Sequence, residues 1–331
     1  MHARYDEPYE DLLGLWSDLE AALAVLLTDP LRIPGFAIKL HQIDLWLQDL
    51  ITQDTDAALY LMFQRASSTT VGYSSSHAVV CAGLCHILAK ALNLPQSERD
   101  TLIHASLTMN IGMTVLQNQL AEQRSPLSSP QAEAVKQHPQ EGRQVLERLM
   151  VRDTLWLETV QHHHVVLPPA PLAQLQPLAR LVRILGTVDR YAALISPRKT
   201  RSGRSAAESL QILQQGQQYA DEVKQALIDV VGLYPPGTYV QLDNGEVAVV
   251  LRRGKTADEP QIASVIDRDG SSLYPPIWHL DGRRPVIQSA LARSSLTLDL
   301  DLRSMAQLGG HSSRGNAALN RVIKLPGSQP R

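Results

Sequence analysis

The sequence of 331 residues has only two cysteines and two phenylalanines, and aromatic residues make up 5% of it. A core with so few aromatic side chains must be filled by Leu, Val, Ile and Ala, which favours a helical protein. No stretch approaches the roughly 20 consecutive apolar residues needed to cross a bilayer. Residues 1–11 are polar and acidic, unlike a secretory signal peptide. We therefore expect a cytoplasmic protein without a membrane span.

A strong excess of charge of either sign is also absent. The chain has 31 basic and 33 acidic residues, a formal net charge of -2. Without a basic surplus there is no electrostatic reason to expect nucleic-acid binding. The hydrophobic share of 44% and the charged share of 19% are typical of a globular protein, and the length suffices for one large domain with appendages.

The two cysteines, Cys81 and Cys85, lie one helical turn apart in an apolar run. Two side chains on one helix face are poorly placed for a disulfide, and two thiols without further cysteines do not form a zinc knuckle. We interpret them as packed free thiols, in keeping with a reducing compartment.

Helical periodicity dominates the chain as far as residue 231. It predicts N-terminal helices within 9–65, broken at Pro30 and Pro34-Gly35, with Asp54 capping the third. Ser97 is predicted to cap a helix that carries Met109-Asn110. The helix capped by Ser97 is predicted to cover 98–116. The other predicted helices cover 78–92, 131–150, 153 to the histidines at 162–164, and 177–195, and one or two more lie within 205–231.

The pattern changes at Tyr234-Pro235-Pro236-Gly237. Segments 238–242 and 246–251 alternate like strands around Asp243-Asn244-Gly245, a turn sequence typical of a hairpin. Two more strands are predicted, and such a short β module is stable only if it docks. From Arg303 onward the chain is rich in Gly, Ser and Asn and predicts a disordered tail. The two further strands are predicted to cover 261–266 and 272–280. The chain is predicted to divide into four regions: the N-terminal helices at 1–70, the main helical domain at 71–232, the β module at 233–290, and a linker with the tail at 291–331.

Several histidines and one acid fall on successive predicted helices. His77, His138, the triplet His162-His163-His164 and Asp189 could converge and hold a metal ion. Met109 and Asn110, where two more ligands would be expected, offer a thioether and an amide. Taken singly, each histidine is more often a surface or helix-terminal residue than a ligand, so the order and spacing must carry the interpretation.

That order and spacing resemble the HD-GYP family of HD-superfamily phosphohydrolases over about residues 77–234. His77 matches the family's opening histidine, and Met109 to Met113 occupies the frame of its His-Asp-Ile-Gly-Lys motif, of which Ile-Gly remains. His138-Pro139 matches a family His-Pro. The histidine triplet matches the His-His-Glu motif, with His163 and His164 the favoured pair and His162 the alternative.

The resemblance continues beyond the histidines. Asp189 keeps the first acid of a late family motif, and Arg198 and Arg201 fill two cationic positions that bind substrate phosphate in the family. Residues 216–219 resemble the family's Gly-x-x-Phe stretch, whereas 166–169 replace the Gly-Tyr-Pro loop. The resemblance implies a mainly α HD-domain helical bundle, here with an N-terminal helical cap and a small C-terminal β module.

Family members hold two or three divalent metals, and the Asp of the doublet bridges two of them. Asn110 lacks that charge, Met109 replaces an imidazole, and Met113 removes a cation. The resemblance leaves His77 and Asp189 as remnants of one metal site. His138, His163 and His164 remain as ligands for at most one divalent transition metal (Zn, Fe or Mn), and a metal-free protein is the other alternative.

The function predicted from these departures is that of a degenerate HD-GYP-like bacterial signalling protein, with no catalytic residues expected. It would act by binding a nucleotide or a protein partner in a signalling pathway, and cyclic di-GMP bound through Arg198 and Arg201 is one such ligand. The alternative is a metal-dependent phosphodiesterase that hydrolyses cyclic di-GMP, or another phosphohydrolase.

Overall fold

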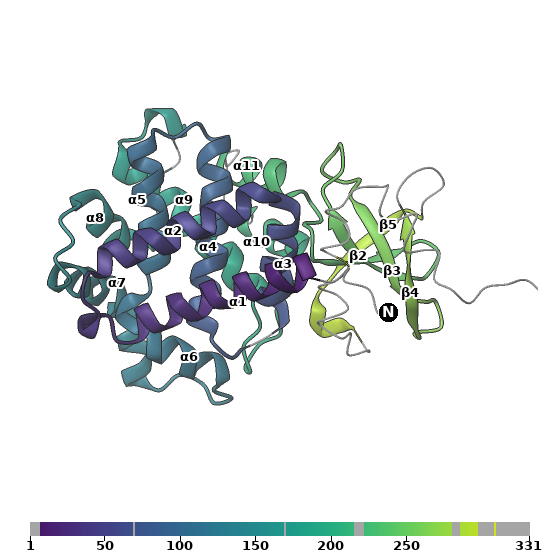
Figure 1. Ribbon diagram of the computed structural model, residues 1–331, viewed down its shortest axis with the longest axis horizontal. Coiled ribbons are helices and arrows are strands. Elements are labelled where there is room, and N and C mark those ends of the chain that lie inside the picture. The colour runs from purple at the N-terminus through teal and green to yellow at the C-terminus, as the bar shows by residue number, and fades with distance from the viewer. Residues whose placement is uncertain are drawn as a thin grey trace, which may run out of the picture.

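The computed structural model describes residues 7–68, 70–168, 170–214, 222–279, 285–296 and 308. Helices form one body and a small antiparallel sheet packs at its end (Figure 1). This arrangement confirms the mainly α fold with a C-terminal β module. Among the described residues, no helix combines the length and apolar character required to span a membrane.

The N-terminal helices follow the predicted pattern. Asp54 Oδ1 accepts hydrogen bonds from the backbone N–H groups of Asp56 and Ala57 at 3.0 and 3.1 Å, which confirms it as a helix cap. Figure 1 shows the first two helices lying along one face of the helical body. They are α1 (Glu7–Thr28), η1 (Pro30–Arg32), α2 (Phe36–Gln53) and α3 (Thr55–Ser68).

The central body is built around α4, which packs against α1, α5, α9 and α11. Its side chains are buried on nearly every face, and both cysteines on it are free and buried, as predicted. The elements are α4 (Tyr73–Ala91), α5 (Gln96–Thr108), η2 (Ile111–Met113), α6 (Thr114–Glu122), α7 (Ser129–Arg148), α8 (Thr154–His162), η3 (Leu172–Gln174), α9 (Pro177–Ile195), α10 (Ala206–Gln214) and α11 (Glu222–Val231).

Three details of the predicted helices were wrong. The predicted helix 98–116 ends at Thr108, because the chain turns at Met109-Asn110 into η2 before α6 begins. Pro95, not Ser97, occupies the cap position of α5. Finally, α4 begins at Tyr73 rather than at 78, so His77 lies within the helix, in its second turn, and not before it.

The β module is an antiparallel sheet with the strand order β4-β3-β2-β1-β5. Gly245 has a φ of +87° in the predicted hairpin turn, a conformation that glycine adopts without strain. The prediction missed β5, which pairs with β1 through a register shift after Gln241. The strands are β1 (Tyr239–Leu242), β2 (Val247–Arg252), β3 (Gln261–Ile266), β4 (Ser272–His279) and β5 (Ile287–Leu291).

The sheet docks on α3, as a module of this size requires. Gln64 donates a hydrogen bond to the carbonyl of Gly237 at 2.6 Å. Arg252 makes a two-pronged ion pair with Asp54, with N–O distances of 2.9 and 3.1 Å. The aliphatic core of the helical body continues into the sheet, so these contacts lie at the edge of one hydrophobic interior. The exact division of the chain into 1–70, 71–232, 233–290 and 291–331 stays a prediction, and the predicted tail from 303 lies outside the described residues apart from Leu308.

Candidate metal centre

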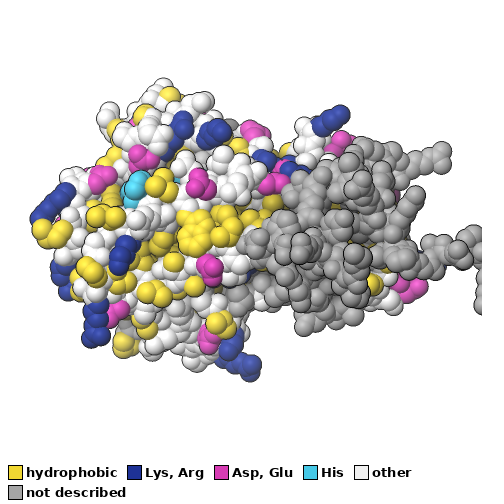
Figure 2. All heavy atoms as spheres, viewed as in Figure 1, with side chains coloured by type: hydrophobic (Ala, Val, Ile, Leu, Met, Phe, Trp, Pro, Cys, Tyr) yellow, Lys and Arg dark blue, Asp and Glu magenta, His cyan; other side chains and the backbone are white. Residues whose placement is uncertain are grey.

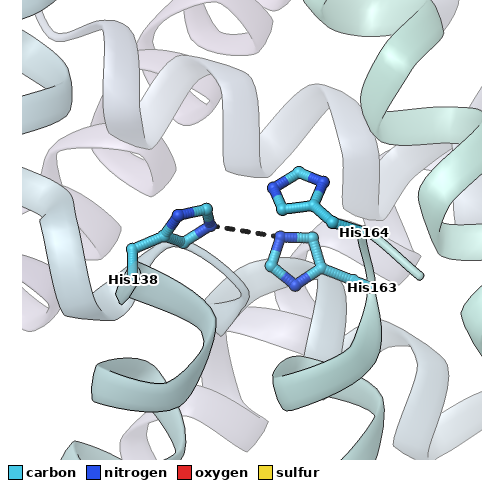
Figure 3. A group of neighbouring side chains, drawn as sticks. All are labelled: His138, His163 and His164. Carbon is cyan, nitrogen blue, oxygen red and sulfur yellow. Dashed lines mark hydrogen bonds between the residues drawn. The ribbon is translucent and has the colours of Figure 1, made fainter. Parts of the chain in front are cut away.

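Two buried histidines from different helices face each other in the helical body. His138 lies within α7 and His163 is the residue at the C-terminal end of α8; each is 1% exposed. Their Nε2 atoms are 3.3 Å apart (Figure 3). The more exposed ring of His164 lies over that of His163, with 4.0 Å between the ring centres. Ligand atoms from all three residues lie within 4.8 Å of one another.

Each buried ring is oriented by a backbone carbonyl three residues earlier. His138 Nδ1 donates to the carbonyl of Val135, and His163 Nδ1 donates to that of Val160, both at 2.6 Å. The Val135 carbonyl is free because Pro139, four residues later in the same helix, has no N–H. The Val160 carbonyl is free because α8 ends at His162. Proline and the helix end thus supply equivalent acceptors for the two rings.

Two glycines allow the surrounding backbone to approach these histidines closely. A Cβ at Gly112, in η2, would lie 2.6 Å from the carbonyl oxygen of His138. A Cβ at Gly186, in α9, would lie 2.6 Å from the carbonyl oxygen of His163. Real Cβ atoms do not approach oxygen so closely, so any other residue at either place would push a histidine-bearing segment away.

The protonation state of the His138 and His163 rings suits the binding of one metal ion between them. Since each Nδ1 carries the donated proton, both neutral rings present an Nε2 lone pair to the other. Burial lowers the pKa of His138, and it lowers that of His163 to about 3, so both rings are neutral near pH 7. Two ligands of a tetrahedral zinc ion, at about 2.0–2.1 Å from it, lie about 3.3–3.4 Å apart. The observed separation of 3.3 Å therefore suits a shared cation.

His77 and Asp189 form a second pair beside the three histidines. His77, on α4, has its Nε2 2.8 Å from Asp189 Oδ1 on α9. Burial raises the pKa of Asp189, but the hydrogen bond and charge of His77 hold it well below its usual range. His164 Nδ1 lies 3.8 Å from Asp189 Oδ2 and links the pair to the histidine group. All five residues proposed as ligands from the sequence are thereby brought into one continuous cluster.

Known proteins share this architecture. Residues 60–223 match the HD domain family. Over 200 residues, 59% of this chain, the sequence is 29% identical to the cyclic di-GMP phosphodiesterase PA4108 of Pseudomonas aeruginosa. The fold is similar to that of Bd1817, an HDG"Y"P protein from Bdellovibrio bacteriovorus, with a TM-score of 0.51 and 16% identity over 70% of this chain and 74% of that chain. Residues 60–223 therefore form an HD domain.

The matched region covers 48% of the Pseudomonas protein, so this chain corresponds to about half the length of that relative. At 16% identity, the likeness to Bd1817 concerns the fold alone. Among the positions of the HD-GYP motifs, residues 216–219 lie outside the described residues. The loop 166–169 is described up to Pro168, whose carbonyl accepts a hydrogen bond from Arg183 at 2.5 Å.

The Met109-Asn110 pair lies at the turn between α5 and η2. Met109 is buried in the core. Asn110 directly precedes η2 and Met113 is its last residue, and both are partly buried. The same η2 carries Gly112, which packs against the His138 carbonyl. The turn that breaks the predicted helix therefore lies beside the cluster of His138, His163 and His164. A carboxylate at 110 would add negative charge at this turn; the amide adds none.

The two predicted phosphate-binding arginines lie in one tight turn but have different contacts. Arg198 and Arg201 exchange backbone hydrogen bonds of 2.8 and 2.9 Å. Arg201 donates to the backbone carbonyls of Ala193 and Ser196, which ties it into the turn. The Arg198 guanidinium lies 5.2 Å from the centre of the Tyr73 ring. Of the two, Arg198 is less constrained by the turn.

Sequence reasoning missed two neighbours of His77. The Tyr73 ring stacks on the His77 ring, with 5.6 Å between centres and an angle of 11°. The Cys81 sulfur lies 3.6 Å from His77 Nε2. Helical spacing could have signalled both, because each is four residues from His77 and so lies on the same face of α4.

Proposed function

We propose that this chain is a catalytically degenerate HD-GYP-like signalling protein, which holds at most one divalent transition metal in the cluster around His138 and acts by binding. The metal would be held by His138, His163 and His164 and would be of the Zn, Fe or Mn class. His77 and Asp189 would remain as partners of that site, without a second ion. The bound ligand would be cyclic di-GMP or a protein partner of a signalling pathway.

The proposal rests on a difference between two pairs of residues: His138 and His163 are poised to bind a metal ion, whereas His77 and Asp189 are not. The imidazoles of His138 and His163 are buried, neutral and held 3.3 Å apart by hydrogen bonds of their own. By contrast, His77 and Asp189 hydrogen-bond to each other, and the nearby turn offers the Met109 thioether and the Asn110 amide. A neutral amide is a poor bridge between two dications because it does not offset their repulsion.

The second candidate function is metal-dependent hydrolysis of cyclic di-GMP or of another phosphate ester. The intact histidine group favours it, together with the likeness to a Pseudomonas aeruginosa protein named as a cyclic di-GMP phosphodiesterase. A zinc-like ion with three protein ligands and an open position lowers the pKa of bound water. In that case His138 and His163 would orient the ion, and Arg198 would bind substrate phosphate.

Metal analysis combined with a hydrolysis assay tests the proposal. The protein is purified without chelator, and its metal content is compared with that of His138→Ala; we expect the substitution to remove no more than one equivalent. His162→Ala is the matched control, because His162 points Nδ1 at the carbonyl of Glu158 and is not in the ligand group. A loss of two equivalents with His138→Ala would contradict the proposal.

Hydrolysis of cyclic di-GMP is then measured with added Mn²⁺ or Fe²⁺. The proposal predicts a rate no higher than that of His138→Ala under the same conditions. Turnover well above this variant, retained in His162→Ala, would establish the enzymatic alternative instead.

A further inference from the structure

A second group of potential ligands lies away from the HD-GYP motifs, where α2 crosses α4 and α5. His41 and Asp44 come from α2 and His104 from α5. One ligand atom from each lies within 4.8 Å of the other two. His41 and Asp44 are three residues apart, a spacing that places both side chains on the same face of α2. Figure 2 shows histidine atoms at the surface of the face that carries α1 and α2.

The carboxylate at the centre of this group is buried and held on one side only. Asp44 is 4% exposed. Its Oδ1 accepts a hydrogen bond of 2.8 Å from His86 Nε2 on α4. Ligating carboxylates typically have one oxygen fixed in this way by an outer hydrogen-bond donor, which leaves the other oxygen free to face an ion.

The other oxygen faces a histidine nitrogen without a hydrogen bond between them. Asp44 Oδ2 is 3.3 Å from His104 Nε2, which is close enough for attraction between charges but poorly aligned for a hydrogen bond. That nitrogen is buried and has no hydrogen-bond partner among the described residues. The His104 ring is fixed from the other side by Trp156, with ring centres 5.0 Å apart. A buried nitrogen without a hydrogen-bond partner, 3.3 Å from a carboxylate oxygen, is an arrangement that a cation would stabilise.

The third residue of this cluster, His41, is exposed and lies next to His104, with 5.8 Å between the ring centres. Its side chain is free to adjust toward an ion at the surface. We propose that His41, Asp44 and His104 bind a divalent transition ion of the zinc class, with His86 orienting the carboxylate. Two imidazoles and one carboxylate form a ligand set that zinc accepts, with water in the fourth position.

Such an ion would connect the N-terminal helical cap to the HD domain. Its ligands come from α2 on one side and α5 on the other, while the orienting histidine comes from α4. Because only the folded chain brings these three helices together, zinc binding would raise the unfolding temperature.

Zinc titration of the metal-stripped protein by calorimetry tests the site. We expect His41→Ala to remove one equivalent relative to the parent chain, and His104→Gln to do the same. His138→Ala, which lies in the other cluster, should leave this equivalent in place. His279→Ala, a partly buried histidine of the β module, is the control for the loss of a histidine as such. His86→Gln should weaken this equivalent roughly 10- to 100-fold, as for loss of an outer hydrogen bond.

His41 is exposed, so its replacement should leave the fold intact, which the unfolding temperature of the zinc-free variant checks. An unchanged stoichiometry and affinity in His41→Ala would overturn the proposal. So would a zinc-dependent rise in unfolding temperature that stays the same when His41→Ala is added to the His138→Ala variant. Either result would identify the group as a metal-free hydrogen-bond network around Asp44. Neither depends on whether the HD-GYP cluster binds metal.

Discussion

Gly186 in α9 lies directly against the backbone of His163, where an added Cβ would be 2.6 Å from the histidine carbonyl oxygen. The same helix carries Asp189, one turn later, which hydrogen-bonds to His77. Close contact between α9 and the end of α8 therefore fixes His163 and Asp189 relative to each other. The geometry of the cluster depends on a residue that has no side chain.

Gly186→Ala is expected to separate α9 from the end of α8. The shift should destabilise the protein by about 1–3 kcal/mol, since neither backbone can yield easily. It should also weaken metal binding by displacing His163. Urea denaturation and metal titration measure the two effects.

Gly14→Ala is the matched control for that substitution. Gly14 lies in α1, is exposed, and has nothing within 4 Å of its hypothetical Cβ. Alanine there should stabilise the helix by about 0.5–1 kcal/mol. Equal effects of the two substitutions would show that the contact with His163 is unimportant.

Pro139→Ala is expected to change stability and metal binding in opposite directions. Removing a proline from the interior of α7 should stabilise that helix, by up to about 3 kcal/mol. The new N–H at 139 would compete for the Val135 carbonyl, which now accepts the His138 Nδ1–H bond. Metal affinity should fall, by up to roughly 10- to 100-fold as for loss of an outer hydrogen bond. Calorimetric titration beside thermal unfolding checks this, and unchanged affinity would show that the carbonyl does not orient the ring.

Restoring the doublet should restore a second ion. In the double substitution Met109→His and Asn110→Asp, a carboxylate and an imidazole return to the turn before η2, close to the histidine cluster. We expect one more bound equivalent of Mn²⁺ or Fe²⁺ than in the parent chain, because the bridge between two cations is anionic again. The single substitution Met109→His is the control without the carboxylate. If metal content stays unchanged in a folded double variant, position 110 does not explain the loss.

Much of the fold follows from local patterns in the sequence. The helix α9 was predicted with its observed bounds because Pro177 opens it and its apolar residues recur with a strong helical period. The hairpin at Asp243-Asn244-Gly245 was predicted because its turn chemistry is local. Strand β5 was missed because it is short and half exposed, and its partner β1 lies more than forty residues earlier in the sequence.

The candidate site was only partly predictable, for a similar reason. His138, His163, His164, His77 and Asp189 could be proposed from motif spacing, and the structure brings them together, although their roles stay predictions. What fixes the rings is tertiary or depends on a helix end: the Val160 carbonyl is free only because α8 stops at His162. The break at Met109-Asn110 was missed because the apolar period continues through it.

Cyclic di-GMP binding is expected to depend more on Arg198 than on its neighbours in the turn. The Arg198 guanidinium lies over the Tyr73 ring, which in turn stacks on His77. It therefore lies on the same side of α4 as His77. Arg198→Ala should weaken dinucleotide binding at least roughly tenfold, a charge-assisted hydrogen bond contributing about 1.5–3 kcal/mol. Lys199→Ala removes an exposed cation from the same turn and should have little effect. Equal losses in both variants would indicate general electrostatic attraction, and no saturable binding by the parent chain would remove the dinucleotide as a ligand.

The attachment of the β module should depend on Asp54, which has two tasks. It caps α3, and it pairs with Arg252 of β2 through both carboxylate oxygens. Asp54→Ala should cost about 1–2 kcal/mol for the cap, with up to about 1 kcal/mol more for the partly exposed ion pair. Arg268→Ala breaks an ion pair with Asp269 in which both side chains are 79% exposed, and should change stability by less than about 0.5 kcal/mol. Urea denaturation followed by circular dichroism compares the two. A module that docks mainly through its apolar core would instead lose only the cap contribution of about 1–2 kcal/mol in Asp54→Ala.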